Sequence, residues 1–345
     1  MSRWAVVLAG GVGSRFWPLS TPERPKQLLP LVTEKPLLHD TVDRLGAIVD
    51  PAHTLILTNA SLTKPIRKLL GTIPRENIIA EPHPAGTAAA LVWAALAIRD
   101  RDGRDATMIC VHADWAIGDE ARFRETLLRA EALAVKTHSL VTVGIVPTRA
   151  DPGFGYIQPE SESGDPSRVK RFVEKPDRVR ADEMRNNGYL WNSGIFVWRV
   201  GDFLEEVDRH TPELAAALRH GSEADASQFF GSVVMPVSVD VGVLERSDKV
   251  MVVPGDFGWD DIGTWAALSR VRSRDEFGNV TSGDAHLLDS ADNVVHAESG
   301  QVVLYGVNDL VVVTHNGLTL VTTTERASDL KRLVESLSAA NLGES

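Results

Sequence analysis

Residues 4–16 read Trp4-Ala5-Val6-Val7-Leu8-Ala9-Gly10-Gly11-Val12-Gly13-Ser14-Arg15-Phe16, an apolar run that leads directly into glycines. A short apolar run that ends at glycine is typical of a buried strand. Glycines let the backbone turn sharply and direct its N–H groups at an anion. The dinucleotide fingerprint would need glycine at Phe16, and no Gly-Lys-Ser/Thr follows for a P-loop. The turn is therefore either purely structural or, together with Arg15 and the later Lys26, suited to a polyphosphate.

Further along the chain, short apolar runs alternate with amphipathic helical stretches as far as about residue 265. Hydrophobic strands separated by helices indicate a mainly parallel sheet covered on both faces, which predicts an α/β, Rossmann-like domain. Ligands of such sheets bind outside the carboxyl ends of the strands. The expected strands are residues 5–9, 54–58, 77–80, 107–111, 140–145, 169–174, 194–198 and 250–253. The expected helices are residues 37–48, 61–70, 87–99, 122–136 and 212–219.

The pattern changes after about residue 274. Residues 278–324 contain short Val/Leu-rich runs that are interrupted by Asn, Asp and Gly, and a helical pattern returns only at residues 328–337. This spacing predicts a small β domain or β-coil, closed by a terminal helix. We therefore expect a large α/β domain in residues 1–270 and a small β-helix-like domain in residues 271–345.

Composition excludes several classes of protein. The 345 residues carry a net charge of −11, which argues against general binding to nucleic acid or to anionic membranes. The single cysteine, Cys110, excludes an internal disulfide framework and favours a reducing, cytoplasmic location. The longest apolar run, residues 88–98, has 11 residues and is too short to span a bilayer. A locally basic pocket remains compatible with this overall charge.

Two polar positions follow expected strands. Gly86-Thr87 stands at the start of a predicted helix, where it could cap the helix or meet a base or sugar through the backbone. Asp114 comes just after the strand at residues 107–111, where a carboxylate can hold Mg²⁺ against phosphate oxygens. An ordinary loop aspartate is the alternative at this position.

Three later motifs also carry polar groups. Glu174-Lys175 combines a hydroxyl acceptor with an ammonium, and Asn192 offers an amide that both donates and accepts. These types suit a phosphorylated sugar, although a surface ion pair and a turn explain them equally well. In Asp260-Asp261, adjacent carboxylates point in different directions, so one can reach a metal while the other orients a neighbour.

Taken together, these segments resemble the sugar-1-phosphate nucleotidylyltransferases, and within that family the branch that uses GTP and mannose 1-phosphate. The continuation Trp17-Pro18-Leu19-Ser20, followed by Pro25-Lys26-Gln27-Leu28, is the most specific part of the match. The other motifs occur in the family's order. The matching segments are residues 8–20, 25–29, 172–176, 191–196 and 258–265.

The resemblance implies a reaction in which the oxygen of a sugar phosphate attacks the α-phosphorus of GTP in line and expels pyrophosphate. Mg²⁺, held by Asp114 and Asp261, would draw the two anions together, with Asp260 as the neighbouring carboxylate. Arg15 would steady the leaving pyrophosphate, and Lys26 the reacting phosphates. The implied nucleotide-binding residues are Leu8, Gly10, Gly11, Gly13, Gly86 and Thr87.

The resemblance also implies a sugar-phosphate site. Glu174 and Asn192 would bind sugar hydroxyls, Lys175 the sugar phosphate, and Gly155 or Tyr156 the sugar ring. The chain departs from the family where Ala85-Gly86-Thr87-Ala88-Ala89-Ala90 replaces Arg-Asn-Thr-Ala-Pro-Ala, which weakens the expectation of guanine. The flanks of Asp114 are also altered.

Several alternatives therefore stay open. The enzyme could use another base, or another sugar such as glucose 1-phosphate or a heptose phosphate. A non-catalytic sensor of nucleotide-sugars is a second reading, which the presence of Arg15, Lys26, Asp114 and Asp261 disfavours. A nicotinamide-linked oxidoreductase lacks its glycine fingerprint. Exposed edges in the β tail favour a homodimer.

Overall fold

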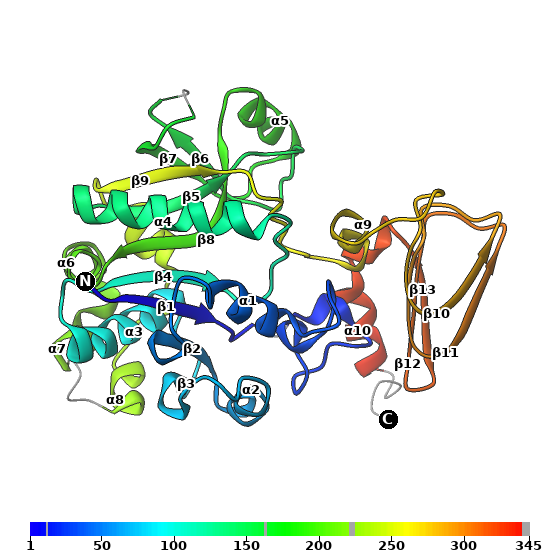
Figure 1. Ribbon diagram of the computed structural model, residues 1–345, viewed down its shortest axis with the longest axis horizontal. Helices are drawn as coiled ribbons and strands as arrows, with labels where there is room; N and C mark the ends of the chain where they lie inside the picture. Colours follow the sequence, from blue (N-terminus) through cyan, green and yellow to red (C-terminus); the bar gives the residue numbers. More distant parts are fainter. Residues whose placement is uncertain (12, 162–163, 221–224, 340–345) are drawn as a thin grey trace. The chain divides into compact units, whose positions relative to one another are not determined.

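The computed structural model describes residues 1–11, 13–161, 164–220 and 225–339, and its chain divides into two compact units (Figure 1). The large unit contains Met1–Gly10, Asp43–His112 and Asp119–Phe257. The small unit contains Gly11–Val42, Ala113–Gly118 and the chain from Gly258 onward. The glycine turn after the first strand therefore belongs partly to each unit.

A nine-stranded sheet forms the centre of the large unit, in the order β3-β2-β1-β4-β8-β5-β9-β7-β6 (Figure 1). The strands are β1 (Arg3–Leu8), β2 (Thr54–Asn59), β3 (Ile78–Glu81), β4 (Thr107–His112), β5 (Leu140–Ile145), β6 (Tyr156–Pro159), β7 (Ser167–Val173), β8 (Leu190–Arg199) and β9 (Val250–Gly255). The helices that accompany them are α2 (Thr63–Leu69), α3 (Thr87–Asp102), α4 (Glu120–Thr137), α5 (Arg178–Asn186), α6 (Val200–His210), α7 (Ala215–His220) and α8 (Ala226–Gly231). Helix α1 (Leu37–Leu45) crosses from the small unit into the large one.

The predicted α/β class is confirmed, and the sheet is mixed. β1, β2, β3 and β4 are parallel, as are β5 and β9. β8 runs antiparallel to β4, β5 and β6, and β7 runs antiparallel to β6 and β9. Strand direction is invisible in a short apolar run, because a buried strand shows the same residue types in either direction.

The core on one face of this sheet explains why the first strand forms where it does. Trp4 and Val6 of β1 point to the face that α3 and α6 cover, and both are buried. Helix α3 packs closely there because its buried face is rich in alanine. Its C-terminus ends at Gly103, whose left-handed φ of 84° lets the N–H bond back to Arg99 O. Tight helix–sheet packing holds the strand ends, and hence the loops that follow them, in place.

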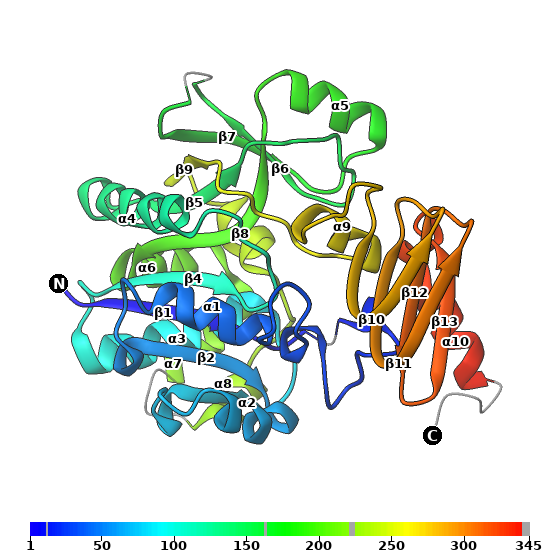
Figure 2. The ribbon, with the colours of Figure 1, turned by 45° about the vertical axis from the view of Figure 1, so that its right-hand side comes forward.

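The small unit contains a four-stranded sheet in the order β10-β11-β12-β13 (Figure 2). Its elements are β10 (Val280–Leu288), β11 (Val294–Tyr305), β12 (Leu310–His315), β13 (Leu318–Thr323), α9 (Leu268–Val271) and α10 (Leu330–Ala339). β10, β11 and β12 are parallel, whereas β12 and β13 form a hairpin across Asn316-Gly317, both with positive φ. Buried Asn293 donates to Asn279 Oδ1 and to Val307 O, so polar side chains satisfy the backbone of the coil. The predicted C-terminal β part is confirmed.

The β tail shares its core with the segment that follows the glycine turn. Phe16, Leu29 and Leu31 form one buried cluster with Val311 and Val313 of β12. Trp265 belongs to this cluster, and its indole N–H donates to Trp17 O at 3.0 Å. The tail therefore supports the backbone that carries Arg15 and Lys26.

None of the helices in the described ranges is both long and apolar enough to cross a membrane.

Candidate active site

The glycine turn after β1 is shaped by close contacts with the segment at Lys26. Gly13 has φ of 63°, and a Cβ built on it would lie 2.4 Å from Cβ of Lys26. Only glycine fits this position, because both the backbone conformation and the neighbouring side chain exclude a methyl group. The buried Gln27 amide donates to Gly11 O at 2.9 Å, which holds the turn from the other side.

Several predicted residues of the small unit converge in one pocket of about 220 Å³. The ammonium of Lys26 donates to Asp114 Oδ2 at 3.0 Å and to the backbone oxygen of Asp261 at 2.5 Å. Lys26 is buried, and Arg15 is exposed. The pocket is lined by Gly13, Arg15, Phe16, Lys26, Asp114, Trp115, Asp261, Ile262 and Gly263. It thus joins three segments that are far apart in the sequence, with cations and carboxylates side by side.

The adjacent carboxylates Asp260 and Asp261 have different environments. Asp260 is buried and accepts from Arg270 Nε at 2.6 Å and from Arg270 Nη2 at 2.9 Å. Asp261 faces the pocket, where burial raises the pKa of its carboxyl, while Lys26 opposes that shift. Asp260 therefore holds the turn through an ion pair, and Asp261 offers its side chain to the pocket.

The donor set of this pocket fits a divalent metal. Hard cations such as Mg²⁺ bind through one or two carboxylates together with substrate phosphates and water. Asp114 and Asp261 supply two such carboxylates within one pocket. No cluster of three or more His, Cys, Asp or Glu residues with metal-binding geometry occurs among the described residues. The protein groups present suit an ion that shares its coordination with substrate, rather than one enclosed by protein.

In the large unit, the predicted nucleotide loop at Gly86-Thr87 is tied to a distant segment. A Cβ on Gly86, whose φ is 85°, would lie 2.2 Å from Val237 O. The hydroxyl of Thr87 accepts from the backbone N–H of Val239 at 3.0 Å, and Ala88 N–H donates to Val237 O. Both predicted residues thus have a structural role, and the Thr87 hydroxyl keeps its own proton to donate.

Glu81, the last residue of β3, was not singled out from the sequence, although it lies close to Gly10, one of the predicted nucleotide-binding residues. Its Oε1 lies 3.9 Å from the position a Cβ of Gly10 would take, and burial raises the pKa of its carboxyl to about 7. No described residue donates a hydrogen bond to it. Leu8, at the end of the neighbouring β1, packs against the core. A carboxylate after a buried strand could have been flagged by the rule that singled out Asp114.

The predicted sugar-phosphate residues lie together in the large unit. A Cβ on Gly155 would lie 2.7 Å from Glu174 Oε2 and 3.5 Å from Cβ of Asn192. Lys175 donates to Glu174 Oε1 at 2.5 Å. The exception is Tyr156, which is fully buried and whose hydroxyl bonds to the backbone of Asp151. Its side chain holds the preceding loop and does not face outward.

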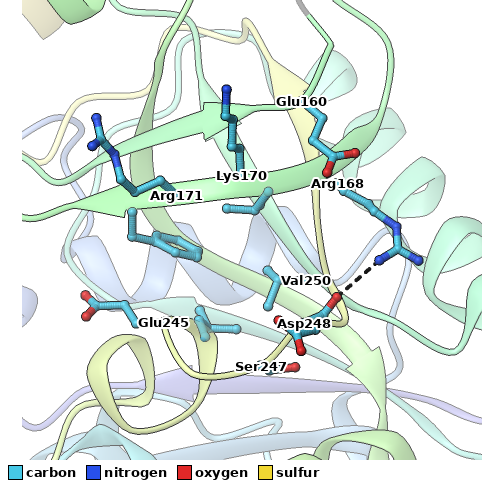
Figure 3. Close-up of a pocket in the computed structure, with 11 residues that line it drawn as sticks. Glu160, Arg168, Lys170, Arg171, Glu245, Ser247, Asp248 and Val250 are labelled. Atoms are coloured by element: carbon cyan, nitrogen blue, oxygen red, sulfur yellow. Dashed lines mark hydrogen bonds between the residues drawn. The ribbon is translucent and has the colours of Figure 1, made fainter.

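A separate pocket of about 560 Å³ in the large unit contains none of the predicted site residues (Figure 3). The guanidinium of Arg168 donates to Asp248 O at 3.4 Å, and this bond is the dashed line in Figure 3. Three acidic and three basic side chains line it, so it presents no excess of positive charge for an anion. Its lining residues are Glu160, Arg168, Val169, Lys170, Arg171, Phe172, Leu244, Glu245, Ser247, Asp248 and Val250.

Comparison with known proteins shows the family to which the chain belongs. A family model described as nucleotidyl transferase matches residues 4–276, and one described as MannoseP isomerase/GMP-like beta-helix domain matches residues 283–337. A mannose-1-phosphate guanylyltransferase from Klebsiella pneumoniae is 36% identical over 96% of this chain and 73% of its own length. The alginate biosynthesis protein AlgA of Pseudomonas aeruginosa is 33% identical over 98% of this chain and 73% of its own.

Solved structures give the same result. The crystal structure described as mannose-1-phosphate geranyltransferase from Thermus thermophilus superposes with a TM-score of 0.92 at 34% identity. That match covers 98% of this chain and 100% of the other. Because the family model covers more than half of the chain and the relatives align along nearly all of it, this protein belongs to the nucleotidyl transferase family, in the group with a C-terminal mannose-phosphate-isomerase-like β-helix domain.

Proposed function

We propose that this protein transfers GMP from GTP to mannose 1-phosphate, giving GDP-mannose and pyrophosphate. The observation that carries the proposal is the convergence of Arg15, Lys26, Asp114 and Asp261 in one small pocket. This chemistry is supported by the relatives named mannose-1-phosphate guanylyltransferase. In the reaction, a sugar-phosphate oxygen bonds to the α-phosphorus of GTP as the bond to the β-phosphate oxygen breaks, and pyrophosphate leaves.

The residues of the small unit would act on the phosphates. Lys26 is buried and already held by Asp114, so its charge is in place before substrate binds. Arg15 is exposed and can follow the leaving pyrophosphate. The N–H groups of the turn at Gly11 and Gly13 would bind further phosphate oxygens.

Nucleotidyl transferases generally use a divalent metal, and we propose Mg²⁺ held by Asp114 and Asp261. Such an ion neutralises charge on the phosphates and orients them for displacement. Asp261 must be ionised to serve as a ligand, and burial raises the pKa of its carboxyl, which opposes ionisation. Lys26 counteracts this by favouring the charged carboxylate.

For the sugar phosphate we propose Glu174, Lys175, Asn192 and the backbone at Gly155, and for the nucleotide Leu8, Gly10, Gly86 and Thr87. Clustering around Gly155 supports the first set. We further propose that residues 1–270 carry the catalytic groups and that residues 271–345 form a β domain, which packs against the segment around Phe16 and Leu29 and does not fold separately from it. We also propose a cytoplasmic location and a homodimer. Leu288 and Tyr305, which pair across β10 and β11 and are exposed, support self-association through the tail.

The proposal is tested by measuring pyrophosphate release with each of the four ribonucleoside triphosphates and with mannose 1-phosphate, glucose 1-phosphate or a heptose 1-phosphate. We expect GTP with mannose 1-phosphate to give the highest kcat/KM. Another best pair would contradict the specific substrates and leave a sugar-1-phosphate nucleotidyltransferase of other specificity. Binding of nucleotide-sugar with no release from any pair would favour the sensor reading.

A further inference from the structure

Asn192 is presented by a distortion of β8. The pairing of β8 with β5 shifts register between Val143 and Gly144, so that Ser193 and Gly194 lie in a bulge. Ser193 is buried, and its hydroxyl donates to Val143 O at 2.6 Å. Gly194 supplies the positive φ of 71°. Bulges of this kind redirect a neighbouring side chain, here Asn192, out of the regular sheet.

The amide of Asn192 has a fixed orientation because of a partner that the sequence did not single out. Its Nδ2 donates to Asp240 Oδ1 at 2.7 Å, and its Oδ1 accepts from Gly194 N–H at 3.3 Å. A carboxylate can only accept, so the amide must turn its NH₂ group toward Asp240. A flipped Asn192 would place two acceptors against each other. Asp240 thereby decides where Asn192 donates and where it accepts.

Asp240 is itself held by the segment that contacts the nucleotide loop. Val239, next to it, donates to Thr87, and Val237 accepts from Ala88. On its other side Asp240 begins a π-helical turn (Asp240–Leu244), in which Glu245 N–H donates to Asp240 O. The backbone is thus held on both sides of Asp240. A residue that orients a ligand-binding side chain needs such a fixed position.

The surroundings of Asp240 remain acidic and polar. It and Glu174 both raise the pKa of Glu245, after the larger effect of burial. No described residue donates to its second oxygen, Oδ2. The bond from the Asn192 amide is therefore the contact through which Asp240 can act on a ligand.

We propose that Asp240 is a positioning residue for the sugar phosphate, which holds the Asn192 amide in the one orientation that matches the hydroxyls of the substrate. The proposal rests on the proposed role of Asn192 in sugar binding. It adds a residue far along the chain to the sugar site, and connects that site through Val239 to the loop at Gly86-Thr87.

The test is a double-mutant cycle with Asp240→Ala, Asn192→Ala and the double variant, with KM for mannose 1-phosphate and KM for GTP measured separately. We expect Asp240→Ala to raise KM for the sugar phosphate about tenfold or more, because it removes a charge-assisted hydrogen bond. KM for GTP should stay within about twofold. In the Asn192→Ala background the same change should add little, since Asp240 acts through that amide.

Asp240→Asn is the conservative variant. It keeps a hydrogen bond but allows both amides to flip, so we expect a smaller rise in KM and weaker discrimination between mannose 1-phosphate and glucose 1-phosphate. Asp248→Asn, an exposed carboxylate on the same stretch of chain, is the matched control and should leave both KM values unchanged.

Additive effects in the cycle, or a rise in KM for GTP equal to that for the sugar phosphate, would overturn the inference. Failure of the proposed function looks different: the wild-type protein would then prefer another sugar phosphate. The same cycle run with that substrate decides the role of Asp240 independently. Thermal melting of each variant separates loss of fold from loss of recognition.

Discussion

Asp260 and Asp261 are adjacent in the sequence, but their carboxylates have different surroundings in the folded chain. The first is buried in a two-bond ion pair with Arg270, whereas the second faces the pocket that contains Lys26. Removing one partner of a buried pair leaves the other charge uncompensated. If Asp261 holds a metal as proposed, its removal should cost activity instead, because its contribution is made with substrate bound.

The matched substitutions Asp260→Asn and Asp261→Asn should therefore separate stability from activity. We expect Asp260→Asn to lower the free energy of unfolding by about 2 kcal/mol, less than for a fully buried pair because Arg270 is partly exposed. Asp261→Asn should leave stability nearly unchanged and lower kcat on the order of 100-fold. Urea denaturation and pyrophosphate release measure the two effects. Unchanged turnover in Asp261→Asn would falsify its assignment to the metal.

Glu81 should make stability depend on pH. Burial raises the pKa of its carboxyl from 4.5 to about 7, so the folded protein retains a proton that the unfolded chain has lost. The stabilising contribution is thus complete below about pH 4.5 and is lost as pH rises toward about 7. From this shift we expect a fall of roughly 3 kcal/mol in the free energy of unfolding over that range.

The variant Glu81→Gln should lack this fall, so that it gains stability relative to wild type at about pH 8 but not at about pH 4.5. Urea denaturation at the two pH values measures the difference. Glu76→Gln, an exposed carboxylate just before β3, is the control. Equal stability differences at both pH values would show that Glu81 is solvated in the folded state.

At the scale of elements, the loops after β1 and before α3 depend on close backbone approach. Gly13 lies against Lys26, and Gly86 against Val237, in each case with positive φ. These contacts join segments that are distant in sequence, so a side chain there would displace a whole loop and not only its own backbone. The role of each glycine is therefore to let a neighbouring segment approach closely, and for Gly13 that segment carries Lys26.

Gly13→Ala should disturb both stability and catalysis. A non-glycine residue at φ of 63° costs about 1–3 kcal/mol, and its methyl group would push Lys26 away from Asp114. We expect a lower melting temperature and a fall in kcat. Gly71→Ala, at a turn position with nothing within 4 Å of its Cβ and no positive φ, is the control and should change neither quantity. Normal kcat in Gly13→Ala would mean that Lys26 tolerates the displacement.

At the scale of the molecule, the β tail and the pocket that contains Lys26 belong to one folded unit. Phe16, Leu29 and Leu31 share a buried cluster with Val311 and Val313. Leu19 and Trp17, from the same segment, also pack in this cluster. The β domain therefore supports the segment that carries Lys26 as well as being an appended fold.

A chain shortened to residues 1–270 should accordingly be inactive, because loss of the tail exposes the apolar side of the segment that carries Lys26. Hydrogen exchange of residues 13–31 should increase, while β1, β2 and β4 remain protected. Val313→Ala in the full chain is the milder version and should lower stability by about 1–3 kcal/mol. A fully active shortened chain would contradict this dependence and support two independent domains.

Much of the fold and part of the site follow from local sequence. The apolar run at residues 4–9, the glycines after it and the alternation of strands and helices predicted the α/β class, and the Asn- and Gly-punctuated runs after residue 278 predicted the β tail. These signals are local, because burial and turn geometry select residue types within a few positions. The segments β6, α5 and the π-helical turn at residues 240–244 were not expected, since they are short and only weakly periodic.

Which side chains pair with one another was decided by the tertiary structure alone. The sequence singled out Lys26, Asp114, Asp261 and Asn192 as residue types able to bind phosphate, metal and sugar. Only the folded chain brings Lys26 between the two aspartates, pairs Asp260 with Arg270, and sets Asp240 against Asn192. The reason is physical: hydrogen bonds and ion pairs act over about 3 Å, and residues tens to hundreds of positions apart come that close only after the sheet and its loops have packed.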